Sequence, residues 1–181
     1  MSVASKESKQ SAQIGLLRLL ARIYLKEVDE ELVSFLKEQD CLDVFGLSFS
    51  PWSAEQEDEA AVEYCRLFIT PGVCVPLASA FLGGAKGGSK GEGGAVALMV
   101  PGILEQLDVS LEPKLAELPN DHLSLLFSLW ALLLEEGEGG EQFKELCIEP
   151  WALAFVVRLE EEAQHPFYQG LAQITRECLQ S

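Results

Sequence analysis

The chain has 181 residues, of which 48% are hydrophobic, and its 29 acidic and 13 basic side chains give a net charge of −16 at neutral pH. This apolar content argues against a chain that is disordered throughout, and the length fits a single domain over residues 1–181 with a sizeable core. So strong a negative charge repels phosphate backbones, which argues against nucleic acid as a partner and favours a basic polypeptide segment.

No apolar stretch reaches the roughly eighteen uncharged residues that a membrane span requires. Residues 1–13 form a polar tail without the apolar segment of an export signal. The five cysteines are widely spaced and include no C-x-x-C pair, and His122 and His165 lack the i, i+4 spacing of a helical metal site. We therefore expect a protein of the reducing cytoplasm, with no stable membrane insertion, no bound metal and no cofactor.

Apolar periodicity and turn residues predict three helices in the first part of the chain. They lie at residues 11–25, 30–37 and 53–69. Segment 42–49, which contains Gly46, is expected to be a turn or a broken helix. Ser53 is a good N-cap for the third helix because acidic residues fill the first turns that follow it, and Pro71 and Gly72 end that helix.

The second part of the chain begins with a glycine-rich segment. Residues 83–94 contain seven glycines and no large apolar residue, which predicts a mobile loop. Helices are expected at 95–107 and 121–136, then from Pro150–Trp151 onward and after His165–Pro166, with a helical turn at 141–147. Helix 121–136 is apolar on nearly every side and should be central. Seven or eight helices without a confident strand predict an all-α bundle with one long loop.

Two catalytic interpretations are weak. Segment 83–90 is glycine-rich like a phosphate-binding loop, but its serine precedes its lysine and no strand leads into it, so a flexible loop is the better interpretation. A Cys–His nucleophile is not favoured, because Cys65, Cys147 and Cys178 occupy apolar helix faces, where cysteines are usually inert. We therefore predict no catalytic residue, and a thiol-dependent or nucleotide hydrolase ranks last among the functions considered.

Asp121 and His122 stand at the entrance to the most apolar helix of the chain. Asn120 or Asp121 can cap this helix by accepting hydrogen bonds from the N–H groups of its first turn. Such a cap leaves His122 unexplained. An imidazole beside a carboxylate at a helix end can also face a groove and bind a peptide through hydrogen bonds, so the structural and the binding roles both stay open.

Three segments, in a fixed order over roughly residues 14–180, carry a family resemblance. Residues 64–81 are similar to an aromatic-x-x-Leu-Phe…Pro…Pro…Ser-x-aromatic signature. Residues 117–123 are similar to an E-x-P-D-H-L motif with Asn120 inserted, and Trp151 with residues 165–168 is similar to a C-terminal Trp…Pro-Phe-Tyr pattern. Together they resemble the TorD/DmsD/NarJ family of redox-enzyme maturation chaperones.

The resemblance implies an all-helical chaperone rather than an enzyme. Such a chaperone binds the N-terminal leader of an apo-molybdoenzyme subunit, often a leader of the twin-arginine type, and holds it for cofactor insertion, assembly and export. A basic and apolar leader needs a hydrophobic groove beside negative charge. The alternative is a general acidic helical scaffold that binds a basic protein segment without recognising a leader. The chain is expected to be a monomer or a segment-exchanged dimer.

The peptide-binding residues expected from these motifs have distinct roles. They are Asp121, His122, Glu117, Pro119, Tyr64, Phe68, Pro76, Ser79 and Phe81. Four of them, Tyr64, Phe68, Pro76 and Phe81, are expected to line an apolar face. Asp121 and Glu117 are expected to receive the cationic segment, and His122 to fix the peptide by hydrogen bonding.

Overall fold

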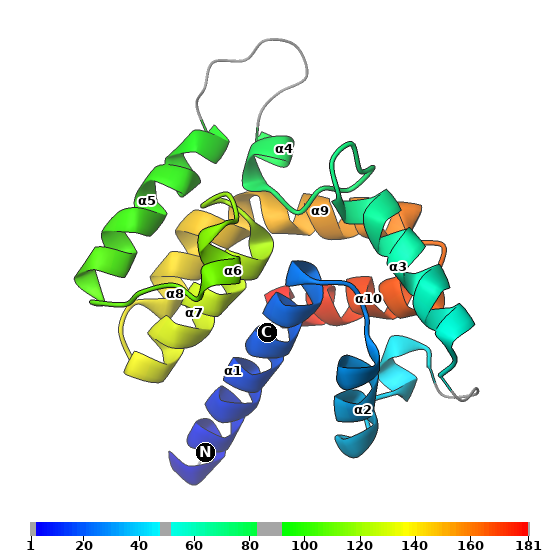
Figure 1. Ribbon diagram of the computed structural model, residues 1–181. Coiled ribbons are helices and arrows are strands. Elements are labelled where there is room, and N and C mark those ends of the chain that lie inside the picture. Colours follow the sequence, from blue (N-terminus) through cyan, green and yellow to red (C-terminus); the bar gives the residue numbers. More distant parts are fainter. Residues whose placement is uncertain (1–2, 48–51, 83–91, 181) are drawn as a thin grey trace. The chain divides into compact units, whose positions relative to one another are not determined.

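The computed structural model describes residues 3–47, 52–82 and 92–180, and these residues form helices and no strand (Figure 1). Seven α-helices of the described chain are nine or more residues long: α1 (Val3–Leu25), α2 (Glu30–Glu38), α3 (Ala54–Phe68), α5 (Glu92–Gln106), α7 (Leu123–Glu136), α9 (Glu149–Glu162) and α10 (Pro166–Gln180). The shorter elements are α4 (Ala78–Leu82), α6 (Pro113–Ala116), α8 (Gly140–Phe143), the 3-10 helix η1 (Asp43–Phe45) and the π-helical turn η2 (Lys144–Ile148). The predicted all-α class is confirmed.

The chain divides into two compact units. Unit 1 comprises Met1–Leu25 and Pro76–Ala152, and unit 2 comprises Lys26–Val75 and Leu153–Ser181. Helix α9 begins in unit 1 and ends in unit 2. Within the described ranges, no helix has both the length and the apolar character that crossing a bilayer demands.

The core of unit 1 forms where α1 packs against α7 (Figure 1). The Ser124 hydroxyl donates a hydrogen bond to the Ala21 carbonyl at 2.7 Å, and the rings of Tyr24 and Phe127 lie 6.2 Å apart. All of these side chains are buried, as is Trp130. The prediction that helix 121–136 is central is confirmed, although the helix begins two residues later, at Leu123. Helix α1 extends back to Val3, across the predicted polar tail.

The core of unit 2 is aromatic. The Phe68 ring lies 5.3 Å from Tyr64, 5.7 Å from Tyr168 and 6.5 Å from Phe155. Helix α10 packs on η1 so closely that a Cβ at Gly170 would lie 2.7 Å from the carbonyl oxygen of Val44, so only glycine fits there. The aromatic contacts of Phe68 and this close approach of Gly170 hold α3, η1 and α10 together.

Several local predictions are confirmed and a few are corrected. Ser53 caps α3 in a capping box with Gln56. Helix α5 begins at Glu92, so residues 92–94 are helical rather than part of the predicted loop, and residues 83–91 lie outside the described part of the chain. Cys65, expected among the buried cysteines, is exposed. The predicted turn at 42–49 contains η1, and residues 48–49 also lie outside the described residues.

Candidate functional site

Two of the sequence motifs meet in unit 1 although about forty residues separate them. Leu77 and His122 form an antiparallel bridge. On either side of it, the Leu123 N–H donates to the Pro76 carbonyl at 2.9 Å, and the Ala78 N–H donates to the Asp121 carbonyl at 3.1 Å. We call this junction of residues 76–81 with residues 117–123 the corner. It brings seven of the nine expected site residues into one unit.

Asp121 holds the corner together. Asp121 is only 5% exposed. Its Oδ2 accepts a hydrogen bond from the backbone N–H of Ser79 at 2.8 Å. Ser79 lies in the first turn of α4, where backbone N–H groups lack helical partners and favour an anionic acceptor. The carboxylate therefore caps α4, and the prediction that Asn120 or Asp121 caps the helix at 121–136 is wrong. Asn120 instead donates to the Ala97 carbonyl of α5 at 3.4 Å.

His122 is the N-cap of α7. Its Nδ1 accepts a hydrogen bond from the Ser124 N–H at 3.2 Å. Because Nδ1 is an acceptor, the proton of the neutral ring belongs on Nε2, an assignment inferred from this hydrogen bond. Burial lowers the pKa of His122 to about 4, although the charge of Asp121 opposes this shift. The imidazole is therefore neutral at pH 7, with Nε2–H as its remaining donor.

The other expected residues of the corner differ in exposure. Ser79, Glu117 and Pro119 are exposed, whereas Pro76 is buried. Phe81 is half-buried, and its ring lies 6.0 Å from that of Trp151. The groups of the corner that are accessible to a partner are therefore the Glu117 carboxylate, the Pro119 ring and the Ser79 hydroxyl.

Tyr64 and Phe68 lie in unit 2, where both are buried in the aromatic core. The two rings pack edge to face in this core, so packing alone explains why both residues are aromatic. The sequence motif that contains them therefore contributes residues to both units.

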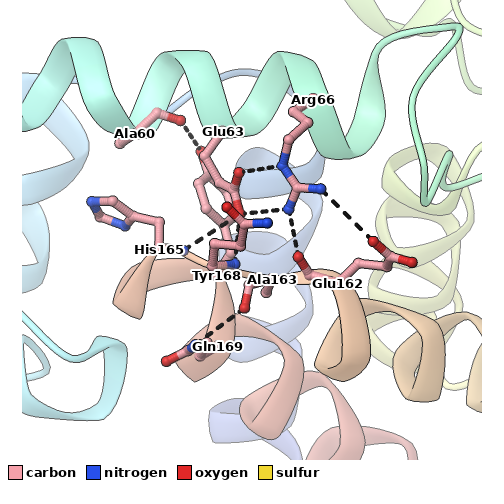
Figure 2. A network of polar contacts seen from close by, with 9 residues as sticks. Ala60, Glu63, Arg66, Glu162, Ala163, His165, Tyr168 and Gln169 are labelled. Carbon is pink, nitrogen blue, oxygen red and sulfur yellow. Dashed lines mark hydrogen bonds and ion pairs between the residues drawn. The ribbon is translucent and has the colours of Figure 1, made fainter.

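Unit 2 contains a polar network that the sequence analysis missed. Figure 2 shows Glu63 directed from α3 toward the chain between α9 and α10, with Arg66 beside it. The guanidinium donates to the Glu63 carboxylate at 2.7 and 2.9 Å, and the Gln164 backbone N–H donates to the same carboxylate at 2.7 Å. Arg66 also donates to the Glu162 carbonyl, and Tyr168 donates to the Ala60 carbonyl at 3.0 Å. These bonds hold α3 to the α9–α10 junction.

The electrostatics of Glu63 follow from these partners. Burial alone would raise the pKa of Glu63, but the hydrogen bonds from Arg66, Gln164 and His165 and the charge of Arg66 together hold it below its usual value. Glu63 is therefore ionised at neutral pH, and its role is structural. An acidic residue three positions before an arginine was the only available signal in the sequence, and it is common on exposed helices.

A second feature missing from the sequence analysis is an apolar groove in unit 1. Its wall combines α5, the end of α7 and the α8–η2 segment, which Figure 1 shows side by side. The apolar groove is a cavity of about 240 Å³, and a second cavity of about 230 Å³, with a mostly polar lining, shares Gln106, Leu107 and Glu138 with it. In the part of the chain that the structure describes, no cluster of three or more His, Cys, Asp or Glu side chains is arranged to hold a metal ion.

Comparison with known families gives a match to this chain. A family model described as the nitrate reductase delta subunit matches residues 24–157, which is more than half of the chain. The matched range includes α3, the corner and the residues that line the groove. A comparison with curated proteins gives no match.

Proposed function

This chain belongs to the nitrate reductase delta subunit family of molybdoenzyme maturation chaperones, and we propose on that premise that it binds the N-terminal leader of an apo-molybdoenzyme subunit. The leader is of the twin-arginine type, and the chaperone holds it in the cytoplasm for cofactor insertion, assembly and export. The family predicted from the sequence motifs is confirmed. The leader and its binding site are the proposed part.

The observation that carries the proposal is the negative charge of residues 94–149, the part of unit 1 that includes residues 117–123 of the corner. Between residues 94 and 149 there are eleven acidic residues and two basic ones. The acidic residues are Glu105, Asp108, Glu112, Glu117, Asp121, Glu135, Glu136, Glu138, Glu141, Glu145 and Glu149, and the basic ones are Lys114 and Lys144. Lys144 is buried, and its ammonium lies 3.7 Å from Glu149. This imbalance attracts a cationic leader and speeds its association.

The corner residues take different roles in this proposal. Glu117 is exposed and receives an arginine of the leader, while the Nε2–H of His122 donates to a leader carbonyl. Asp121 is a positioning residue, because its carboxylate fixes Ser79 and the start of α4. Pro119 and Phe81 supply apolar contacts beside Pro76. Tyr64 and Phe68 support the core of unit 2 and take no part in the proposed contact.

Leader recognition is tested by titrating the protein with three labelled peptides in a fluorescence anisotropy assay. The peptides are a twin-arginine leader, its Lys-Lys version and an unrelated peptide of equal positive charge. We expect the twin-arginine leader to bind most tightly, because guanidinium groups form bidentate bonds with carboxylates, and its affinity to fall as salt rises. Equal binding of all three peptides would instead favour the general acidic scaffold, and no binding would contradict the proposal.

Glu117→Gln is expected to raise the Kd of the twin-arginine leader up to about fivefold, since an exposed ion pair contributes about 0.2–1 kcal/mol. The matched control is Glu112→Gln, which removes the same charge from another exposed residue of this segment. Anisotropy measured at two salt concentrations compares both variants with the unmodified protein. Identical losses in the two variants would show that only net charge matters.

Asp121→Asn and Asp121→Ala separate positioning from direct ion pairing. The asparagine keeps an oxygen that accepts the Ser79 N–H, so its Kd should stay within about twofold of the original. The alanine leaves that N–H without its acceptor, a cost of about 1–3 kcal/mol that should raise the Kd about tenfold. If Asp121→Asn weakens binding as much as Asp121→Ala, the carboxylate charge itself contacts the leader.

A further inference from the structure

Helix α5 contains a proline in its interior, Pro101. In a regular α-helix the N–H of residue 101 would donate to the carbonyl of Ala97, four residues earlier. Proline has no N–H, and its ring also crowds the carbonyl at that position. The Ala97 carbonyl therefore lacks its helical donor, and α5 is weakened at this turn.

Asn120 of the corner supplies a donor to the same carbonyl. Its Nδ2 donates a hydrogen bond to the Ala97 oxygen at 3.4 Å, across 23 residues of sequence. The nitrogen is assigned to this side of the amide because a carbonyl can only accept. An unpaired carbonyl away from water costs free energy, so this bond compensates α5 for the N–H that Pro101 lacks. Asn120 is also the residue inserted into the E-x-P-D-H-L motif, and the bond gives this insertion a role.

The next residue in the chain, Asp121, holds a second helix. Its carboxylate accepts a hydrogen bond from the Ser79 N–H in the first turn of α4. Helices α4 and α5 pack against each other (Figure 1). Two consecutive side chains of the corner therefore fix two helices that are in contact, Asn120 at the proline turn of α5 and Asp121 at the start of α4.

The position of α4 matters for the leader contact. This helix carries Phe81, a proposed apolar contact, whereas Glu117, the proposed acidic contact, lies in the other segment of the corner. The direction of α4 depends on its cap and on its packing against α5. Without the bond from Asn120, α5 is free to bend at Pro101, and this packing is no longer fixed. The apolar and acidic contacts then lose their spacing.

We propose that Asn120 is a positioning residue of the leader site. By bonding to the carbonyl that Pro101 leaves without a helical donor, it fixes the first half of α5 and, through α5, the direction of α4. Asn120 touches α5 and not the leader in this arrangement, so it sets the affinity without contributing a contact of its own. This inference rests on the proposed function for the identity of the ligand.

A double-mutant cycle in the full chain tests the proposal. Pro101→Ala restores the N–H that the Ala97 carbonyl lacks, so Asn120→Ala is made with proline and with alanine at position 101. With proline, Asn120→Ala should speed hydrogen exchange in residues 94–100 about fivefold and raise the Kd of the twin-arginine leader peptide about threefold, because one hydrogen bond of ordinary strength is lost. With alanine, the same substitution should change both quantities less than about twofold, because the helix then supplies its own donor.

Asn120→Asp is a second variant in case the alanine variant does not fold. Aspartate is close to asparagine in size but has no donor, and its charge by itself attracts a cationic leader, so faster exchange in α5 with a higher Kd reflects the lost bond rather than net charge. Equal effects of Asn120→Ala with either residue at position 101 would overturn the proposal, as would an unchanged Kd alongside faster exchange in α5. Failure of the unmodified protein to bind the leader would overturn the proposed function and, with it, the role of Asn120 at a leader site. The exchange data, which need no leader, tell that failure from absence of the bond between Asn120 and α5.

Discussion

Glu63→Ala is expected to lower the free energy of unfolding by about 3 kcal/mol, the low end of the cost of breaking a buried ion pair. The substitution removes the buried carboxylate that accepts hydrogen bonds from the Arg66 guanidinium and from the Gln164 N–H, and Arg66 keeps only its contacts with Glu162. The low end applies because the Arg66 side chain is 30% exposed and regains some hydration. Urea unfolding followed by circular dichroism measures the loss.

The matched control for Glu63 is Glu160, which pairs with Arg176 at the surface of the same unit. Both side chains of that pair are exposed to solvent, so Glu160→Ala should cost no more than about 1 kcal/mol. Equal losses in Glu63→Ala and Glu160→Ala would mean that the network in Figure 2 does not stabilise the α3–α10 contact.

Acid is expected to destabilise the protein between about pH 6.5 and pH 4 through His122. Burial lowers the pKa of His122 to about 4 in the folded state, whereas the unfolded value is near 6.5. In this range the unfolded chain binds a proton that the folded chain does not, so falling pH favours unfolding. The difference corresponds to about 3 kcal/mol at most, and protonation also removes the Nδ1 acceptor that caps α7.

His122→Ser isolates this contribution, because serine keeps the N-cap hydrogen bond but does not titrate. Urea unfolding of both proteins from pH 7.5 to pH 4 should show a shallower loss of stability in the variant. Burial also lowers the pKa of His165, and this histidine contributes equally to both proteins, so it cancels in the comparison. Parallel pH profiles of the two proteins would contradict this prediction, because they would show that folding does not lower the pKa of His122.

Local sequence signals predicted the helices well. Ser53 and the acidic residues that follow it predicted the start of α3. The continuous apolar pattern of residues 123–134 predicted the central helix. Trp151, Phe155 and Leu159 recur at four-residue steps on one face of α9, and all three are buried. These features depend on neighbouring residues, so a single sequence contains the necessary information.

Long-range contacts explain what the sequence did not reveal. The cap of α7 falls on His122 rather than Asp121 because the bridge to Leu77 turns the Asp121 carboxylate toward α4. No neighbouring residue distinguishes Glu63 from the surface acids of α3, and its partner Gln164 is 101 residues away. The groove combines side chains from three helical segments, none of which is unusual by itself.

Hydrogen exchange measured with and without a saturating twin-arginine leader peptide tests the central claim most directly. Leader binding at the corner predicts slower exchange in residues 76–82 and 117–123 and unchanged exchange in α3 and α10. Slower exchange confined to α3 or α10, with residues 76–82 and 117–123 unaffected, would contradict this account.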